Sequence, residues 1–523
     1  MVWAAHGEGL GNTGAQEIER ILLANIATAF DPPATSGGTV GDLKGRTLRS
    51  GVVVLVVQCL KFILRTGSTI ILARILTPDD FGLVAMVTVG LGFFALFKDA
   101  GLSMATVQRE NITHDQISTL FWVNIVVGLI LTALSILTAR LLVGFYREPR
   151  LLGITIALAS MFLFSALGVQ HQALLQRKMR FMTLGVIEIT ALTLSITIGI
   201  CMGLAGCGYW ALVGMTVSFP AANAVALWIA SPWVPGLPHR RCGVRSMLHF
   251  GGTVTVNGLV VYLAYNADKL LLGRYGGTEI LGLYTRAQAL INLPMDQLNS
   301  AIGSVALPTL SRLQSDSERL KRYFLQGYSL VLSATIPITL TSVIFANELI
   351  LFFLGPKWIG AVQVFRLLAP GALALALINP FGWLLFATGQ TGRSLRMAFL
   401  IAPLVILACF IGLQYGAAGV ASGYSGVMIL LVAPLILWAK EGSSITGKDV
   451  MQAVRKPFVA GVIAGFTGEV YKWTIGDMMP MKWRLLFGLC ITLGIYVWLL
   501  LFAMGQKRYY LDLIRHLDPR SDR

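Results

Sequence analysis

Long apolar stretches separated by short polar segments dominate the chain from residue 51 almost to its end. Each stretch holds about 20 residues or more, which as a helix crosses about 30 Å of hydrocarbon. The pattern predicts an all-α polytopic membrane protein with about 14 transmembrane helices, within a range of 12 to 14. The predicted spans are 51–73, 82–105, 118–139, 151–173, 182–204, 208–230, 247–272, 280–306, 326–353, 361–387, 395–414, 417–438, 457–476 and 485–505.

The two ends of the chain lack this pattern. Residues 1–45 are rich in Gly, Ala and Thr and contain Pro32-Pro33, and no basic segment leads into an apolar one as in a cleaved signal peptide. We interpret them as a disordered cytoplasmic tail with a short helix around Gln16–Ala29. Residues 507–523 are predicted to form a basic cytoplasmic tail.

A faint internal repeat divides the predicted helices into halves. Leu72, Arg74, Gly82 and Leu83 recur exactly 200 residues later as Leu272, Arg274, Gly282 and Leu283, at the junction of the first two spans of each half. Parallel halves of this kind usually place the substrate path between them. The predicted domains are an N-lobe of six helices, a cytoplasmic linker, a C-lobe of six helices and an added helix pair, at 46–230, 231–246, 247–440 and 441–506.

Composition supports the membrane assignment. Of 523 residues, 55% are hydrophobic and 13% charged, with a mean hydropathy of +0.72. An average soluble domain is about 25% charged, so this chain cannot supply soluble surfaces. The six cysteines show no metal or disulfide spacing, and no catalytic motif is evident, so we predict neither a metal site nor an enzyme.

The net charge of +16 reflects topology better than a nucleic-acid partner, because cytoplasmic loops carry excess Lys and Arg. With both termini placed in the cytoplasm, inner segments hold about three times as many basic residues as outer loops. One outer loop, with Arg140, Arg147 and Arg150, runs against this trend.

Charged residues inside spans are costly, about 2.5–3.5 kcal/mol each, so they normally face a cavity or a partner. Here they gather in the first two helices of each half. Lys61 and Arg65 share one helical face with Gln58, and two like charges there suit a water-filled cavity that receives an anion. The candidates for a substrate cavity are Gln58, Lys61, Arg65, Lys98, Tyr265, Lys269, Arg286 and Asn292, and those for ion coupling are Asp99, Asp268 and Asp296.

Structural roles remain open for some of these charges. Asp268 and Lys269 could lie near the outer interface with the lysine reaching for water, and Lys98 and Asp99 could form a structural pair near the inner end. Glu188 is either a structural partner or a cavity residue, and Lys472 is interpreted as pairing with Glu469. The charged segment 316–323 is predicted to be an amphipathic surface helix offering its cations to anionic lipid head groups.

Four segments carry distinctive motifs. They are the run from Ala73 to Gly82 (ARILTPDDFG), the run from Asp99 to Ser103 (DAGLS) followed by Val107-Gln108-Arg109, Leu175–Phe181 (LQRKMRF) and Asp268–Arg274 (DKLLLGR). In these motifs the chain resembles the polysaccharide exporter family of the multidrug/oligosaccharidyl-lipid/polysaccharide flippase superfamily, closest to its colanic acid and exopolysaccharide branch. The resemblance extends from about residue 45 to 440, with the motifs in order.

This resemblance implies two six-helix lobes around a central cavity in a bacterial inner membrane. It implies a flippase for polyprenyl-pyrophosphate-linked oligosaccharide units, used to build exopolysaccharide, capsule or lipopolysaccharide by alternating access. Na⁺ or H⁺ would drive it, and a periplasmic polymerase would use the product. The family's basic cavity would correspond to Lys61, Arg65 and Lys98, with Lys269 and Arg286.

Other functions predict different features. A multidrug/cation antiporter would need an acidic cavity, which Lys61 and Arg65 contradict. A lipid II-type flippase from the same superfamily stays open. A membrane polymerase or ligase would need a large periplasmic loop, which the short outer loops do not provide.

Overall fold

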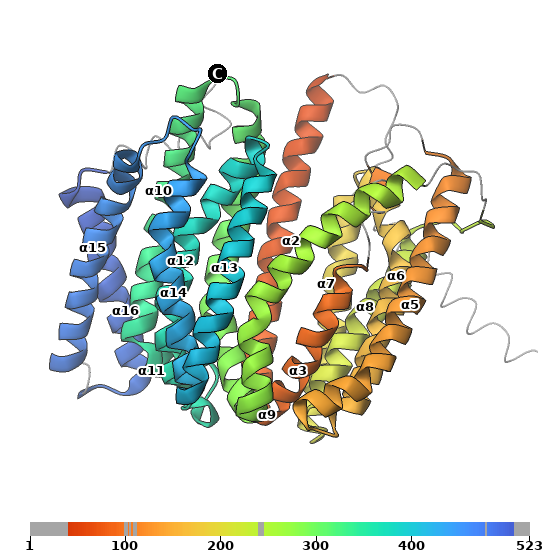
Figure 1. The fold of residues 1–523 in the computed structure, drawn as a ribbon, viewed down its shortest axis with the longest axis horizontal. Helices are drawn as coiled ribbons and strands as arrows, with labels where there is room; N and C mark the ends of the chain where they lie inside the picture. Colours follow the sequence, from red (N-terminus) through yellow and green to blue (C-terminus); the bar gives the residue numbers. More distant parts are fainter. Residues whose placement is uncertain are drawn as a thin grey trace, which may run out of the picture. The chain divides into compact units, whose positions relative to one another are not determined.

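The computed structural model describes residues 40–98, 103, 106–107, 112–238, 245–475 and 478–506. The side chains of 40–55, 245–261, 263–265 and 391 lie outside this description. Every regular element in the described part is helical, and its residues divide into unit 1, Met1–Leu259, and unit 2, Val260–Arg523 (Figure 1). The finer division into lobes, linker and added helix pair remains a prediction.

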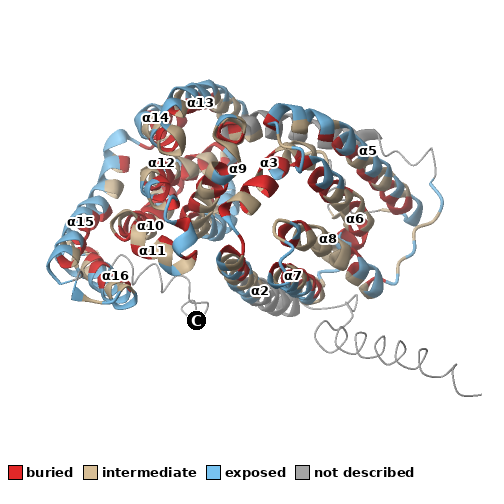
Figure 2. Ribbon diagram, turned by 90° about the horizontal axis from the view of Figure 1, so that it is seen from below, coloured by how far each residue is buried: buried red, intermediate tan, exposed pale blue. Residues whose placement is uncertain are grey.

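The described part of unit 1 contains six helices and the start of a seventh. These are α2 (Val40–Ile75), α3 (Pro78–Ala95), α5 (His114–Tyr146), α6 (Leu151–Arg177), α7 (Phe181–Leu204), α8 (Trp210–Ala230) and the first turns of α9 (Arg245–Arg312). Helix α2 packs along α7, α5 along α6, and α8 against both α6 and α7. Buried residues lie on the faces turned toward these neighbours (Figure 2).

Unit 2 contains the rest of α9 and the later helices. These are α10 (Ser317–Ile344), α11 (Ala346–Phe353), α12 (Ala361–Ala387), α13 (Thr391–Gly412), α14 (Gly416–Ala439), α15 (Gly447–Thr474) and α16 (Met481–Trp498), with a π-helical turn at Leu499–Ala503. Short 3₁₀ turns occupy Pro356–Trp358 and Leu413–Tyr415. Helix α12 packs between α10 and α14, and α15 bridges α10 and α16.

The helix pattern agrees closely with the sequence. Ten helical stretches in the described residues are long and apolar enough to cross a membrane, and one of them, 392–439, takes in both α13 and α14. Helix α12 has the predicted bounds. The exact number of crossings and the side of the termini remain predictions.

Several helix boundaries differ from the sequence prediction; the predicted span 326–353, for example, is divided between α10 and α11. Helix α2 begins at Val40, inside the predicted tail 1–45, and no proline between Val40 and Ile75 interrupts it. Helix α3 begins at Pro78 rather than 82 and ends at Ala95 rather than 105. Segment 316–323 is no separate surface helix, because Asp316 caps α10 and the charged residues form its first turns.

The two repeat junctions turn at equivalent positions. Thr77 separates α2 from α3 with a capping box, in which its side chain and that of Asp80 each accept a backbone N–H. Exactly 200 residues later, Gly277 interrupts α9 with φ 84° and ψ −176°, a region that essentially only glycine occupies. Helix α9 is therefore two helical limbs joined at this glycine. The repeat seen in sequence marks the same chain reversal in each unit.

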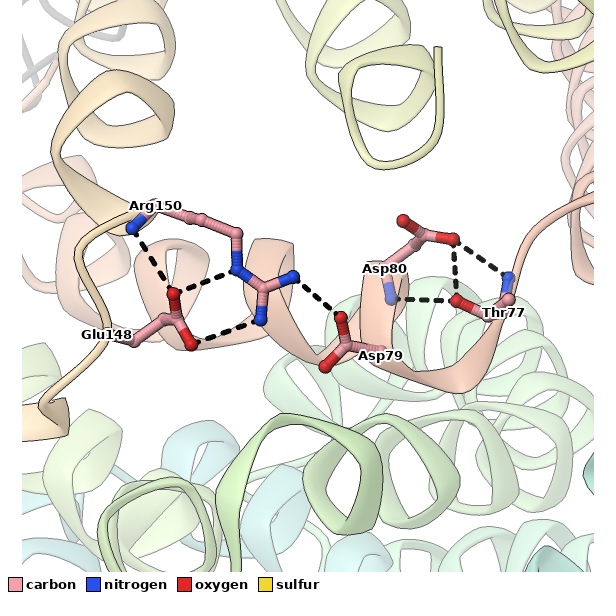
Figure 3. A network of polar contacts seen from close by, with 5 residues as sticks. All are labelled: Thr77, Asp79, Asp80, Glu148 and Arg150. Atoms are coloured by element: carbon pink, nitrogen blue, oxygen red, sulfur yellow. Dashed lines mark hydrogen bonds and ion pairs between the residues drawn. The ribbon is translucent and has the colours of Figure 1, made fainter. Parts of the chain in front are cut away.

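A polar network fixes the turn between α2 and α3 (Figure 3). Arg150, at the start of α6, pairs with Asp79 at 2.9 Å and with Glu148 at 2.8 Å. The hydrogen bonds from Arg150 hold the pKa of Glu148 below its usual value, and the two carboxylates raise the pKa of Arg150. Arg150, one of the three arginines of the loop that ran against the predicted topology, is therefore paired with two carboxylates.

Candidate functional site

Lys61 on α2, one of the predicted cavity residues, is paired with a carboxylate on a neighbouring helix. Its Nζ donates a 2.7 Å hydrogen bond to Oε1 of Glu188 on α7. The Lys61 side chain is 12% exposed and that of Glu188 is 37% exposed. Arg65, one turn later, is exposed, and its guanidinium makes no ion pair among the described residues. The repulsion expected between Lys61 and Arg65 is therefore relieved by a carboxylate on the neighbouring helix.

Glu188 also lines a cavity of about 360 Å³ inside unit 1. The cavity lies among α6, α7, α8 and the turn after α3, and Lys98 lies at its wall. Gln172, Thr216 and Asn223 add uncharged polar groups. The site is thus mixed in charge rather than purely basic, with Lys61 reaching it through Glu188.

Lys98 does not lie inside a helix as the sequence predicted. It follows α3 in a turn, where its backbone N–H donates to the Ala95 carbonyl at 3.3 Å. The earlier start of α3 explains this placement: 18 residues already span about 27 Å, so the chain can turn before Lys98. The predicted partner, Asp99, lies outside the described residues.

Asp268 is the most completely hydrogen-bonded of the predicted coupling residues. It is 2% exposed, and its Oδ2 accepts from Tyr284 Oη at 2.8 Å and from Gln288 Nε2 at 3.2 Å. Its Oδ1 accepts the backbone N–H of Lys269 at 2.8 Å. All three donors are uncharged groups, so among the described residues this buried carboxylate has no direct bond to a cationic side chain.

Lys269 turns away from Asp268. Its Nζ donates to Oδ1 of Asn266 at 3.0 Å, and Asn266 Nδ2 in turn donates to the Tyr262 carbonyl at 2.9 Å. The side chain of Tyr265 lies outside the description, and Gln58 is exposed on α2. Neither Lys269 nor Gln58 lines the cavity that Glu188 and Lys98 share.

A second, smaller cavity of about 50 Å³ lies among α9, α10 and α12 in unit 2. Asn292, Asp296 and Asn299 reach it from α9, Thr335 from α10 and Asn379 from α12. The structure therefore brings together the predicted residues Asn292 and Asp296. It leaves Asp268 outside this cavity, and Arg286 lies half-buried elsewhere on α9.

Sequence reasoning missed three groups. Tyr284 could have been found from the hairpin, because a turn at Gly277 sets residue 268 opposite 286 and so places Tyr284 and Gln288 on either side of the carboxylate. Asn379 on α12 gave no such signal. Glu348 on α11 was also missed, although it is 1% exposed and holds both Lys472 and Arg484 at 3.6 Å. Lys472 thus pairs with Glu348, not with Glu469 as the sequence suggested.

Comparison with known protein families shows to which family the chain belongs. Residues 71–363 match the model of the family described as "Polysaccharide biosynthesis protein", which is more than half of the chain. The chain belongs to this polysaccharide biosynthesis family. The match includes the α2–α3 junction, Glu188, Asp268 and the small cavity up to α10.

Two curated relatives of this family member are similar over most of their length. The teichuronic acid biosynthesis protein TuaB of Bacillus subtilis (strain 168) is 27% identical over 80% of this chain and 87% of its own. The lipopolysaccharide biosynthesis protein WzxC of Escherichia coli (strain K12) is 26% identical over 69% of this chain and 74% of its own. The predicted resemblance to polysaccharide exporters is confirmed.

Solved structures establish the fold of this polysaccharide biosynthesis protein. The lipid II flippase MurJ in an inward closed conformation superposes with a TM-score of 0.71 at 15% identity, covering 88% of this chain and all of that one. A MATE family multidrug resistance transporter of the MOP superfamily, inward-facing, gives 0.58 at 14%, covering 76% and 96%. The chain is thus an all-α multi-pass bacterial membrane protein with the fold of this superfamily, as the sequence predicted.

Proposed function

We propose that this protein flips polyprenyl-pyrophosphate-linked oligosaccharide repeat units across the bacterial inner membrane, for exopolysaccharide, capsule or lipopolysaccharide biosynthesis. Membership of the polysaccharide biosynthesis family over residues 71–363 carries the proposal. The relatives named for teichuronic acid and lipopolysaccharide biosynthesis support a saccharide cargo. The cargo changes sides without a covalent step, so the protein is a transporter and not an enzyme.

The proposed cargo is anionic, and its pyrophosphate carries at least two negative charges. Removing it from water requires compensation by Lys or Arg. Lys61, Arg65 and Lys98 would bind the pyrophosphate in unit 1, with Lys269 and Arg286 as further cations. Gln58, Tyr265 and Asn292 would contact the sugars through hydrogen bonds and ring faces.

The pair of Lys61 and Glu188 gives the proposed site a switch. While Glu188 accepts from Lys61 at 2.7 Å, it neutralises the lysine and occupies the position of an anionic ligand. A pyrophosphate would compete with Glu188 for Lys61, and Glu188, which lines the adjoining cavity, would be released. A ligand that binds the two arrangements with different affinity shifts their populations, which is all that alternating access requires.

An ion gradient would supply the direction of transport, and we propose Na⁺ or H⁺ as the coupling ion. Asp268 could take up a proton or cation because its three donors are uncharged and leave its own charge uncompensated by a direct bond. Asp296, beside Asn292 and Asn299, and Asp99 are the other candidates. The transported unit would pass to a periplasmic polymerase.

The alternatives from the same superfamily differ in cargo. A multidrug/cation antiporter binds cations, whereas Glu188, the carboxylate at the unit 1 cavity, is already paired with Lys61, and Lys98 also lines the cavity. A lipid II-type flippase carries a pyrophosphate too and would use the same cations, so only the saccharide distinguishes it.

A complementation experiment tests the proposal. In cells lacking their own copy, wild-type protein should restore surface polysaccharide, and the Lys61→Ala/Arg65→Ala variant should not, although it inserts into the membrane in normal amount. Lys448→Ala, an exposed cation at the start of α15, is the matched control and should complement fully. Normal export by the double variant would remove these two cations from the cargo site. Drug resistance conferred without polysaccharide export would favour the antiporter instead.

A further inference from the structure

A charged groove lies between α10 and α15 and shares no lining residue with the cavities described above. It encloses about 850 Å³ and is bounded by the first turns of α10, the first half of α15 and the π-helical end of α16. Four cations and two carboxylates line it, namely Lys321, Arg322, Arg455, Lys456, Glu318 and Asp449. All belong to unit 2, so the groove is complete within one part of the structure.

Three of these six charged side chains already bond to other groups of the protein. Lys321 Nζ lies 2.7 Å from Oδ2 of Asp449, which also accepts from Thr446 at the start of α15. The hydrogen bond from Lys321 lowers the pKa of Asp449 to about 2, so the carboxylate is charged near neutral pH and the ion pair joins α10 to α15. Lys456 donates to the carbonyl of Met504 at 3.2 Å and ties α15 to the end of α16.

Two cations remain available to a ligand. Arg322 on α10 and Arg455 on α15 are both exposed, and neither guanidinium makes an ion pair or hydrogen bond among the described residues. A guanidinium presents a planar fork of donors that matches a phosphate. Two such groups on facing walls of one groove form a phosphate-binding arrangement.

The groove continues into an apolar track along α15. Val459, Val462 and Phe466 follow Arg455 at 4, 7 and 11 residues, which places them on one face of the helix, and they are 39%, 50% and 71% exposed. The charged ends of both helices lie on the side that the sequence predicts to be cytoplasmic. The chemistry thus changes from phosphate-binding to lipid-facing along a single helix.

We propose that this groove binds the phosphate head group of an anionic phospholipid of the cytoplasmic leaflet, with its acyl chains along the exposed face of α15. Basic pockets between membrane helices on this side suit such head groups. A soluble phosphate compound would gain nothing from the apolar track, which is why the proposal is a lipid. The inference concerns a site in unit 2 and does not depend on the nature of the transported cargo.

The test uses the full-length protein in neutral detergent, titrated with phosphatidylglycerol, with phosphatidylcholine and with inorganic phosphate. Bound lipid is counted by native mass spectrometry. Arg322→Gln/Arg455→Gln removes the two available cations. Arg319→Gln/Lys448→Gln removes the same charge from the same helix ends, at exposed residues that do not line the groove.

Wild-type protein should bind phosphatidylglycerol in preference to phosphatidylcholine. Each basic residue near a head group changes the affinity by a factor of about five, so the groove variant should lose roughly thirtyfold in affinity for phosphatidylglycerol. The affinity of the matched control should stay within about threefold of the wild-type value. Raising NaCl should weaken binding to the wild-type protein, an expectation that needs no variant.

Several results would overturn the proposal. Equal loss in the groove variant and the matched control would indicate general surface charge. Equal affinity for phosphatidylcholine, or binding that NaCl does not weaken, would exclude recognition of the anionic head group. Competition by inorganic phosphate at concentrations as low as those of the lipid would assign the site to a free anion.

Discussion

Lys61 on α2 and Glu188 on α7 are joined by a 2.7 Å hydrogen bond between residues 127 positions apart in the chain. The pair connects the first helix of unit 1 to the wall of its 360 Å³ cavity. Lys61, for which the sequence indicated no definite partner, is therefore paired with the carboxylate of Glu188. The proposed transport cycle depends on breaking and remaking this pair.

The pair should be visible in stability as well as in transport. Lys61→Met leaves Glu188 half-buried without its partner and should destabilise unit 1 by about 1–3 kcal/mol, less than for a fully buried pair because Glu188 reaches solvent. The Lys61→Met/Glu188→Met double variant should recover most of that loss. Thermal unfolding of the purified variants measures this, and equal, additive losses would mean that the two side chains do not interact.

Glu188→Gln should separate cargo binding from cargo release. It removes the carboxylate that competes for Lys61 and keeps the shape of the side chain. We expect tighter binding of a pyrophosphate-linked cargo together with slower export, measured by cargo retained on the purified protein and by surface polysaccharide. If both binding and export are unchanged, the carboxylate has no part in the cycle.

Asp268→Asn should alter the dependence of export on the proton or sodium gradient, because it removes a buried charge while keeping an oxygen to accept from Tyr284. Tyr284→Phe is the matched control: it loses one hydrogen bond, worth about 1 kcal/mol, and keeps the carboxylate. Gradient dependence is read by dissipating each gradient separately during export. Unchanged dependence in Asp268→Asn and also in Asp296→Asn would remove both as coupling candidates.

Gly277→Ala should destabilise the hairpin of α9 by about 1–3 kcal/mol, because φ 84° with ψ −176° strains any residue with a Cβ. No atom lies within 4 Å of the added methyl group, so the cost is purely conformational. Gly327→Ala, in a helix with equally open space, should instead be neutral or stabilising by up to about 1 kcal/mol. Thermal unfolding compares the two, and equal effects would refute the assigned turn.

Glu348→Ala should loosen the contact of α15 and α16 with α11, because it leaves Lys472 and Arg484 near a position without its counter-charge. The surrounding cluster of Phe345, Tyr471 and Leu485 would then carry the contact alone. Glu469 is an exposed acid on α15, the helix that carries Lys472. Glu469→Ala should change the free energy of unfolding by no more than about 0.5 kcal/mol. A loss of similar size in both variants would contradict the pairing of Lys472 with Glu348.

The sequence predicted where most membrane helices lie but not which side chains pair between them. Apolar runs gave α12 its bounds, because a membrane span must be continuous and apolar. They did not place Lys98, which lies in the turn after α3 and not inside the helix. The start of α3 was misplaced because the cap at Thr77, and not hydropathy, fixes where the helix begins.

Side-chain pairing could be anticipated only where local geometry dictated it. Tyr284 follows from a hairpin turning at Gly277, and the adjacent glycines Gly276 and Gly277 are a signal from which that turn could have been anticipated. The partnership of Lys61 with Glu188 depends on which helices pack together and at what rotation, and helical periodicity contains neither. The same holds for Glu348, whose partners come from two later helices.

The central claim is that Lys61 and Arg65 bind the anionic part of a lipid-linked saccharide during its passage. Purified protein reconstituted in vesicles containing a polyprenyl-pyrophosphate-linked oligosaccharide measures that passage directly, by the fraction of saccharide that becomes accessible on the opposite side. Wild-type protein and Lys448→Ala should move the saccharide under an imposed ion gradient, while Lys61→Ala/Arg65→Ala should fall to the level of empty vesicles. Movement at the wild-type rate by the double variant would contradict the account.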